Sequence, residues 1–214
     1  METDRIIAVG DIHGCRLELE RLLGMIPFDP SRDLLVLLGD YIDRGPEPRG
    51  VLEILSGLVD LHPGHVRCLM GNHEWMFLRY LEGKDTNLYL LNGGETTIAD
   101  YFIQGKGVSI PDRHKKFLDS LEFFLETESY IFVHAGLRPG VPLADQTLDD
   151  LLWIRDEFIS SSYDWGKRVV FAHTPVETPL VQPNKIGIDT GAVYGGRLTA
   201  LILPDLTFIS VEKK

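Results

Sequence analysis

IIAVGDIHG, at residues 6–14, joins an apolar, strand-like run directly to a turn that carries an aspartate and a histidine. The same order of apolar run, glycine and polar group recurs in LLVLLGDYIDRG at residues 34–45 and in VRCLMGNHE at residues 66–74. Short apolar runs bounded by turn residues are typical of strands in a sheet that is covered on both faces. Because parallel strands end at one edge of a sheet, the three turns predict a shared site built from Asp, His and Asn side chains.

Strand and helix signals alternate along most of the chain, without a linker or an internal repeat. Apolar, strand-like segments predict strands at residues 6–9, 34–38, 66–70, 130–133, 169–171, 185–188, 198–203 and 207–211. Helical spacing of apolar residues predicts helices at residues 15–25, 48–59, 74–81, 113–125 and 148–158. The weakly periodic middle, residues 84–111, predicts one or two short helices with loops. Gly and Pro-Asp turns separate the last strands, so we expect a second, more antiparallel sheet there.

The length of 214 residues predicts one domain over residues 1–214, and the alternating strand and helix signals make it α/β. The formal net charge of -11 argues against a general nucleic-acid or anionic-membrane binder, since such binding needs clustered Lys and Arg. It leaves a small phosphorylated substrate open. Cys15 and Cys68 lack a framework spacing and are expected to be reduced thiols. No stretch reaches the ~18 apolar residues of a membrane span, and the first apolar run is too short for a signal peptide. A cytoplasmic location is therefore predicted, and the oligomeric state stays open.

The polar groups at the strand ends have the composition of a two-metal site. Asp11 and His13, two residues apart in an extended turn, can converge on one cation, and Asp40 at the neighbouring strand end is placed to bridge to a second. The second cation would take its remaining ligands from a neutral amide oxygen and two imidazoles that also follow apolar strands: Asn72, His134 and His173. Such mixed ligation without cysteine favours Mn, with Fe or Zn as alternatives.

Two arginines would make the predicted pocket attractive to phosphate in spite of the acidic chain. Arg44 follows the second turn directly and Arg155 lies near the end of a predicted helix. Taken alone, each short motif is more often an ordinary turn than a ligand pair. Their combination, ordered and each after a strand, is what predicts metal-assisted attack on a phosphate ester. The other histidines lie outside strand-end motifs and are expected at the surface: His62, His65 and His114.

These motifs resemble the signature of the PPP-type phosphoprotein phosphatases, within the calcineurin-like metallophosphoesterases. The compact bacterial and bacteriophage branch is the most similar. The likeness runs nearly from end to end and continues in LLNGG at residues 90–94, VHAG at 133–136, LWIR at 152–155, AHTP at 172–175 and IDTG at 188–191. It is weakest at residues 84–89 and 99–129.

The resemblance implies a sandwich of two mixed β-sheets flanked by helices, with two divalent cations. Asp11, His13 and Asp40 are implied on the first cation, and Asp40 with Asn72, His134 and His173 on the second. It further implies that Arg44 and Arg155 hold phosphate oxygens and that His73, oriented by Asp43, protonates the leaving oxygen. A metal-bridged hydroxide would attack phosphorus directly, without a phosphoenzyme. The implied activity is that of a protein serine/threonine phosphatase of broad specificity.

One departure from the family pattern concerns the substrate. The family usually places a phosphate-binding arginine directly before Gly71, where this chain has Met70, and a thioether cannot replace that charged donor. Symmetrical dinucleoside tetraphosphatases also have an apolar residue there and share the C-terminal Asp189-Thr190-Gly191, but they typically lack an aspartate at position 43. Substrates therefore remain a phosphoprotein, a small phosphoester, a phosphodiester or a dinucleotide, and a non-catalytic phosphate-binding module is the distant alternative. The resemblance also favours Tyr194 as a residue lining the pocket.

Overall fold

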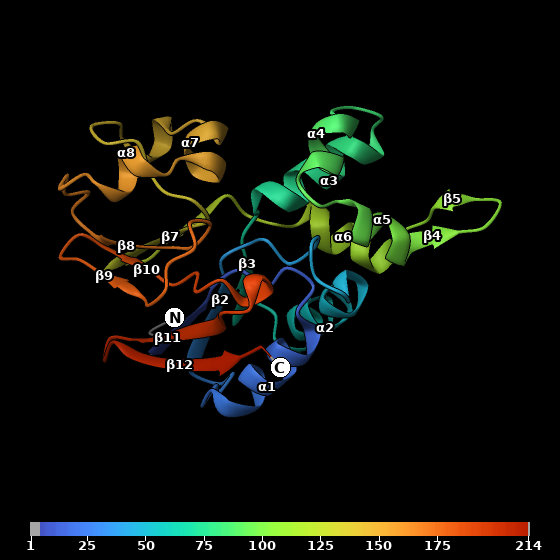
Figure 1. Ribbon diagram of the computed structural model, residues 1–214. Coiled ribbons are helices and arrows are strands. Elements are labelled where there is room, and N and C mark those ends of the chain that lie inside the picture. The colour runs from blue at the N-terminus through green and yellow to red at the C-terminus, as the bar shows by residue number, and fades with distance from the viewer. Residues whose placement is uncertain (1–4, 214) are drawn as a thin grey trace.

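The computed structural model describes residues 5–213 and arranges them as two five-stranded sheets flanked by helices (Figure 1). The first sheet has the order β12-β11-β1-β2-β3 and consists of β1 (Arg5–Val9), β2 (Asp33–Leu37), β3 (Val66–Cys68), β11 (Arg197–Leu203) and β12 (Thr207–Glu212). The strands β1, β2 and β3 run parallel, as the three opening motifs require. Their carboxyl ends therefore meet at one edge of the sheet.

The second sheet has the order β6-β7-β8-β10-β9 and is mixed. It consists of β6 (Phe124–Glu126), β7 (Tyr130–Val133), β8 (Arg168–Phe171), β9 (Leu180–Val181) and β10 (Lys185–Gly187). Its central strands β7, β8 and β10 are parallel, whereas β6 and β9 pair antiparallel at the two edges. The predicted fold class, a sandwich of two mixed sheets with flanking helices, is confirmed.

Helices flank the two sheets (Figure 1). They are α1 (Arg16–Met25), α2 (Pro48–Leu61), α3 (Asn72–Leu81), α4 (Thr86–Leu91), α5 (Glu95–Tyr101), α6 (Asp112–Asp119), α7 (Leu148–Trp153) and α8 (Asp156–Ile159). Two 3-10 turns, η1 (Leu143–Asp145) and η2 (Ala192–Tyr194), and a projecting hairpin of β4 (Phe102–Ile103) and β5 (Gly107–Val108) complete the described elements. Within residues 5–213, no helix has the length and apolar character needed to cross a membrane.

The period of two along the first strand explains why residues 6–9 of β1 are all apolar. Ile6 and Ala8 belong to a core between the two sheets, together with Phe132 and Val170 of the second sheet. Ile7 and Val9 point the other way, into a larger core shared with the helices. Because successive side chains leave a strand on opposite faces, a strand buried on both sides must be apolar throughout.

The structure corrects three predictions of secondary structure. The helix expected at residues 113–125 ends at Asp119, because the backbone N–H of Glu122 bonds to the Cys68 carbonyl and the N–H of Met70 to the Glu122 carbonyl, so the segment runs beside β3. The helix expected at residues 148–158 is divided into α7 and α8, and Arg155 lies at the break. The expected second sheet forms, but its central strands are parallel and the last two strands are not part of it. Instead β11 pairs antiparallel with β1 and extends the first sheet.

One of the three histidines expected at the surface is buried. The ring of His114 is fully enclosed between the Tyr101 hydroxyl, 2.6 Å from Nδ1, and a carboxylate oxygen of Glu53, 2.8 Å from Nε2. His62 and His65 are half-buried. The sequence carried no sign of the His114 contacts, because they join α6 to residues on α2 and α5.

Asp33 at the start of β2 links stability to pH. Burial alone would raise its pKa, but the Arg5 guanidinium at 2.6 Å and the backbone N–H of Asp29 at 2.9 Å hold the pKa below its usual value. A carboxyl with a depressed folded-state pKa stabilises the fold above about pH 4, and this contribution is lost as the pH falls through the folded-state pKa.

Asp33→Asn is therefore expected to lower the free energy of unfolding by about 1–3 kcal/mol at neutral pH. The difference from the wild type should shrink on acidification, since protonation then removes the same contribution from the wild type. Urea unfolding of both chains at neutral pH and at about pH 3 measures this, with the exposed Asp60→Asn as control. A difference that stays constant between the two pH values would contradict the assignment.

Candidate metal centre and active site

The predicted site residues follow the parallel strands of both sheets at their carboxyl ends. Asp11 follows β1, Asp40 follows β2, and Asn72 opens the helix after β3, while His134 follows β7 and His173 follows β8. All five are at least 95% buried. Residues that are far apart in the sequence thus meet at one place, and both sheets contribute to the site.

Several of these turns have a left-handed backbone that non-glycine residues rarely adopt. Positive φ values occur at His13 (44°), Asp40 (51°), Asp43 (69°), Arg44 (65°) and His173 (64°). Such a conformation costs on the order of 1–3 kcal/mol per residue and persists only when the surroundings enforce it. Its concentration at one place marks that place as a functional site.

Glu74, in the first turn of α3, enforces part of this strained backbone. Its two carboxylate oxygens accept hydrogen bonds from the backbone N–H groups of Asp40 (2.8 Å), Tyr41 (2.8 Å), Ile42 (3.2 Å) and Gly71 (3.1 Å). Glu74 is fully buried. It therefore ties the turn after β2 to the start of α3, and so fixes Asp40 relative to Asn72.

Glu74→Gln is expected to cost about 1–3 kcal/mol of stability, because its amide N–H2 would face backbone donors and leave them unsatisfied. Thermal unfolding and metal binding of the variant measure the effect, with Glu82→Gln, at an exposed residue just after the same helix, as control. A variant as stable as the wild type would show that the four bonds do not hold the turn.

One group of buried hydrogen-bond acceptor atoms lies around His134 Nε2, and none of these atoms is a donor. His134 Nε2 lies 3.0 Å from Asn72 Oδ1, 3.1 Å from His173 Nδ1 and 3.5 Å from Asp40 Oδ1. The other His134 nitrogen, Nδ1, donates to the Leu38 carbonyl at 2.8 Å, so Nε2 carries the lone pair. An Asn72 amide turned to present its N–H2 would satisfy these atoms in a metal-free chain. With the carbonyl oxygen inward, the donor set fits a divalent cation.

A second group lies on the other side of Asp40. Its members are His13, Asp40 and His73, with His13 Nε2 at 3.4 Å and His73 Nε2 at 3.9 Å from Asp40 Oδ2. His13 donates through Nδ1 to the Ile42 carbonyl at 2.8 Å, which leaves Nε2 as an acceptor. Arg44 Nη1 occupies that acceptor at 2.7 Å, so this group fits a cation once the guanidinium moves aside.

Asp11 is placed differently from the expectation that it shares a tight group with His13. It belongs to neither three-residue group, and its Oδ1 lies 3.8 Å from His134 Nδ1 and 3.4 Å from the backbone N of His173. Burial, and then the neighbouring carboxylates of Asp189 and Asp40, raise the pKa of Asp11. Such crowded carboxylates favour a cation between them. The pairing of Asp11 with His13 on one ion stays a prediction.

The electrostatic state of the histidines suits metal ligation. Burial lowers the pKa of His13 to about 3 and the pKa of His173 to about 2, so both rings are neutral near pH 7. A neutral imidazole offers the lone pair that a metal needs. The Nε2 atoms of His73 and His173 have no hydrogen-bond partner although they are buried. The His73 atom is therefore open to a bound group, whereas His173 meets the acceptor group through Nδ1 and carries its proton on Nε2.

His73 and Asp43 form a buried pair beside the acceptor groups. His73 Nδ1 donates to Asp43 Oδ2 at 2.6 Å, and both side chains are fully buried. The backbone N–H of His73 donates to Asp40 Oδ1 at 3.1 Å, which anchors the ring next to the shared aspartate. The pair has the geometry of a general acid whose carboxylate stabilises the imidazolium.

A cavity of about 60 Å³ opens over these groups. Arg44 and Arg155 both line it. Arg44 is half-buried, with its guanidinium 5.7 Å from the centre of the Tyr194 ring, and Arg155 is exposed, with Nη1 at 3.4 Å from Thr174 Oγ1. Tyr194 lines the mouth, as the resemblance favoured.

Met70 takes no part in this cavity. It is 5% exposed and packs in the hydrophobic core. The chain therefore replaces the family's usual arginine with a core residue rather than with another donor for phosphate.

The sequence analysis missed several groups around the cavity. Asp189, Asn92, Trp153 and Pro175 also line it. Asp189 is 4% exposed, and burial raises its pKa to about 6. It follows β10 closely, so the strand-end rule applied to the other ligands would have found it.

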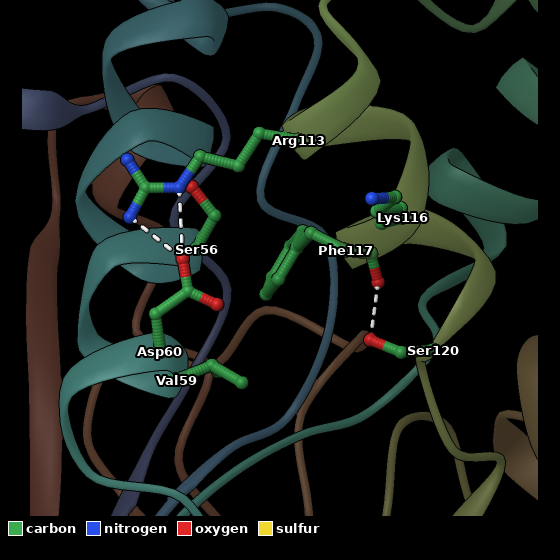
Figure 2. A pocket seen from close by; sticks show the side chains of 7 residues that line it. All are labelled: Ser56, Val59, Asp60, Arg113, Lys116, Phe117 and Ser120. Atoms are coloured by element: carbon green, nitrogen blue, oxygen red, sulfur yellow. Dashed lines mark hydrogen bonds and ion pairs between the residues drawn. The ribbon is translucent and has the colours of Figure 1, made fainter.

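A larger cleft lies elsewhere on the molecule, between α2 and α6, and has a volume of about 320 Å³ (Figure 2). Arg113 reaches across it to Asp60, and Phe117 forms part of its wall. Its lining includes one carboxylate and no histidine. The chemistry of the side chains, not the size of the opening, therefore locates the candidate active site.

Comparisons with known proteins agree with this arrangement. The family model of the calcineurin-like phosphoesterases matches residues 4–200. The chain is 33% identical to bis(5'-nucleosyl)-tetraphosphatase PrpE [asymmetrical] of Geobacillus thermodenitrificans, over 95% of this chain and 92% of that protein. It is 32% identical to serine/threonine-protein phosphatase 1 of Salmonella typhimurium, over 89% of this chain and 88% of that protein.

A solved structure described as a putative diadenosine tetraphosphatase superposes with a TM-score of 0.78 at 29% identity, covering 99% of this chain and 95% of that one. The resemblance to PPP-type phosphatases within the metallophosphoesterases is thereby confirmed. The relatives are named as a protein phosphatase and as an asymmetrical tetraphosphatase, whereas the tetraphosphatase that the sequence left open is the symmetrical kind. By fold, by strand-end motifs and by the extent of the match, the chain belongs to the calcineurin-like phosphoesterase family.

Proposed function

We propose that the chain is a metal-dependent protein serine/threonine phosphatase, which hydrolyses phosphate monoesters. The observation that carries the proposal is the buried His73–Asp43 pair, with Nδ1 and Oδ2 at 2.6 Å. A serine or threonine alkoxide is a poor leaving group, and a positioned acid that protonates it lowers the barrier. A polyphosphate leaving group needs no such proton. The pair is therefore most useful for an alkyl ester.

Two divalent cations, Mn²⁺ with Fe or Zn as alternatives, would supply charge stabilisation at the phosphoryl group and activate water. Asp40 would contact both, because it is common to the two acceptor groups. Asn72, His134 and His173 would hold one cation, and His13 with Asp11 the other. The ligand set is neutral except for its carboxylates, which limits how strongly it offsets the charge of the cations.

The remaining residues act on the substrate. Arg44 and Arg155 would hold the phosphate oxygens and so orient phosphorus over Asp40. A water oxygen forms the new bond to phosphorus and releases one proton, and the bond from phosphorus to the serine oxygen breaks. That oxygen keeps the electron pair and takes the proton from His73 Nε2. The proton released by the water makes up for the one that His73 donates. The products are serine and inorganic phosphate, and no phosphoenzyme is needed.

A dinucleoside tetraphosphate is the second candidate substrate. The specific observation in its favour is Met70, which is buried in the core and gives the site one charged donor fewer for a phosphate dianion. The names of the PrpE relative and of the putative diadenosine tetraphosphatase point the same way. A phosphodiester or a dinucleotide places less charge on the attacked phosphoryl group than a monoester does.

Assaying a phosphoserine peptide and diadenosine tetraphosphate side by side with Mn²⁺ tests the proposal. We expect the larger kcat/KM for the phosphopeptide. Faster turnover of the dinucleotide would overturn the choice of substrate and leave the metal-dependent reaction standing. Bound metal without turnover of any phosphate ester would favour a phosphate-binding module.

A further inference from the structure

Two hydroxyl groups from α4 and α5 meet on one oxygen of Asp43. Tyr89 donates its hydroxyl to Asp43 Oδ1 at 2.6 Å, and Thr97 donates its own to the same oxygen at 2.5 Å. The other oxygen, Oδ2, lies 2.6 Å from His73 Nδ1. All four side chains are fully buried. The two oxygens of Asp43 therefore have separate partners, hydroxyls on one side and the imidazole on the other.

Thr97 also holds the backbone of Asp43. Its oxygen accepts the backbone N–H of Asp43 at 3.0 Å, at a residue whose φ is 69°. One hydroxyl thus binds the main chain and the side chain of the same strained residue. This fixes both the position of the carboxylate and its rotation, which a single bond would leave free.

Close packing around the Tyr89 ring fixes the direction in which its hydroxyl points. The ring lies 5.5 Å from the Phe77 ring and 5.3 Å from the Tyr80 ring, measured between centroids. On another side it lies against Gly94, where an added Cβ would stand 2.5 Å from ring atom Cε1. The hydroxyl therefore reaches Asp43 from a buried ring that is packed against Phe77, Tyr80 and Gly94.

We propose that Tyr89 and Thr97 are positioning residues for the proton that the leaving oxygen receives. The two hydroxyls occupy Oδ1 of Asp43, so only Oδ2 of Asp43 accepts the hydrogen bond from His73 Nδ1. This orientation of the imidazole turns the unpartnered Nε2 of His73 toward the cavity and the shared Asp40. Neither side chain touches the substrate. This inference rests on the proposed function, because it assigns the two hydroxyls to the general acid of that reaction.

The test compares an ester whose leaving group needs a proton with one whose leaving group does not. Tyr89→Phe, Thr97→Val and the double variant are assayed with Mn²⁺ on a phosphoserine peptide and on 4-nitrophenyl phosphate. We expect the ratio of kcat/KM, peptide to nitrophenyl ester, to fall about 10- to 100-fold in the double variant, since small misplacements of a reacting group cost up to about 100-fold. Tyr80→Phe, next to Tyr89 and without a bond to Asp43, is the matched control and keeps the wild-type ratio.

Rescue separates positioning from general packing. Thr97→Ser keeps the hydroxyl and is expected to restore the ratio that Thr97→Val loses. An equal loss on both esters, or an unchanged ratio in the double variant, would overturn the inference. His73→Asn in the same assay keeps the two claims apart. If the ratio falls in His73→Asn but not in the variants of Tyr89 and Thr97, only the inference fails. If the ratio is unchanged in His73→Asn, the proposed role of His73 as general acid fails.

Gly94→Ala provides a second route should Thr97→Val fail to fold. Gly94 has a φ of -67°, which alanine adopts freely, so the added methyl acts only by pushing on the Tyr89 ring. The same fall in the ratio is expected. Gly24→Ala, whose Cβ would meet nothing within 4 Å, is its control. A wild-type ratio in a folded Gly94→Ala chain would count against the inference.

Discussion

Asp40→Asn is expected to remove both metal ions and to lower kcat/KM about a thousandfold or more, because several kcal/mol of charge stabilisation is lost and each 1.36 kcal/mol is tenfold. Asp40 is the residue common to the two acceptor groups among the described residues, with one oxygen 3.5 Å from His134 and the other 3.4 Å from His13. An amide keeps the shape of the carboxylate but removes its charge and turns one acceptor into a donor.

Elemental analysis of the metal content, together with turnover of a phosphopeptide, measures this effect. Asp60→Asn, in the cleft between α2 and α6, is the matched control and should keep both metal and turnover. Two bound ions with wild-type turnover in Asp40→Asn would contradict the placement of the metal centre.

His73→Asn is expected to lower turnover of a phosphoserine peptide by about 10²–10⁴-fold, the usual contribution of a general acid. Its effect on 4-nitrophenyl phosphate should be much smaller, since nitrophenolate leaves without a proton. The physical reason is the position of Nε2, which is buried without a partner 3.9 Å from Asp40 Oδ2. Steady-state kinetics on the two esters give the ratio directly, with His62→Asn, on the far end of α2, as control.

The metal content of His73→Asn provides the decisive check on this role. His73 also belongs to a group that could hold a cation, together with His13 and Asp40. A general acid can be replaced without loss of metal. Loss of one ion in His73→Asn, with equal loss of turnover on both esters, would make His73 a ligand and contradict the acid assignment.

The strands that place the site could be predicted because they are buried on both faces. Residues 6–9 and 34–38 are continuous apolar runs, and both became parallel strands within one or two residues of the expected bounds. The polar residue after each such run lies at the carboxyl edge of the sheet, so the positions of Asp11 and Asp40 could be predicted from local pattern alone.

Other features depend on contacts that local pattern does not encode. Residues 120–125 keep a helical spacing of apolar side chains, yet hydrogen bonds to Cys68 and Met70 draw them alongside β3. Tyr89 and Thr97 sit in a weakly periodic segment, and their bonds to Asp43 span 46 and 54 residues. The return of β11 to pair with β1 likewise joins the two ends of the chain. In each case a tertiary contact decided what the sequence pattern left open.

The central claim, that this chain hydrolyses phosphate monoesters with two bound divalent ions, is tested most directly by titrating the metal-stripped chain with Mn²⁺. Bound metal and turnover of a phosphoserine peptide are measured in the same samples. The account predicts two ions per chain, with turnover absent without metal and rising as both sites fill. Full turnover in the stripped chain, or turnover that never depends on bound metal, would contradict it.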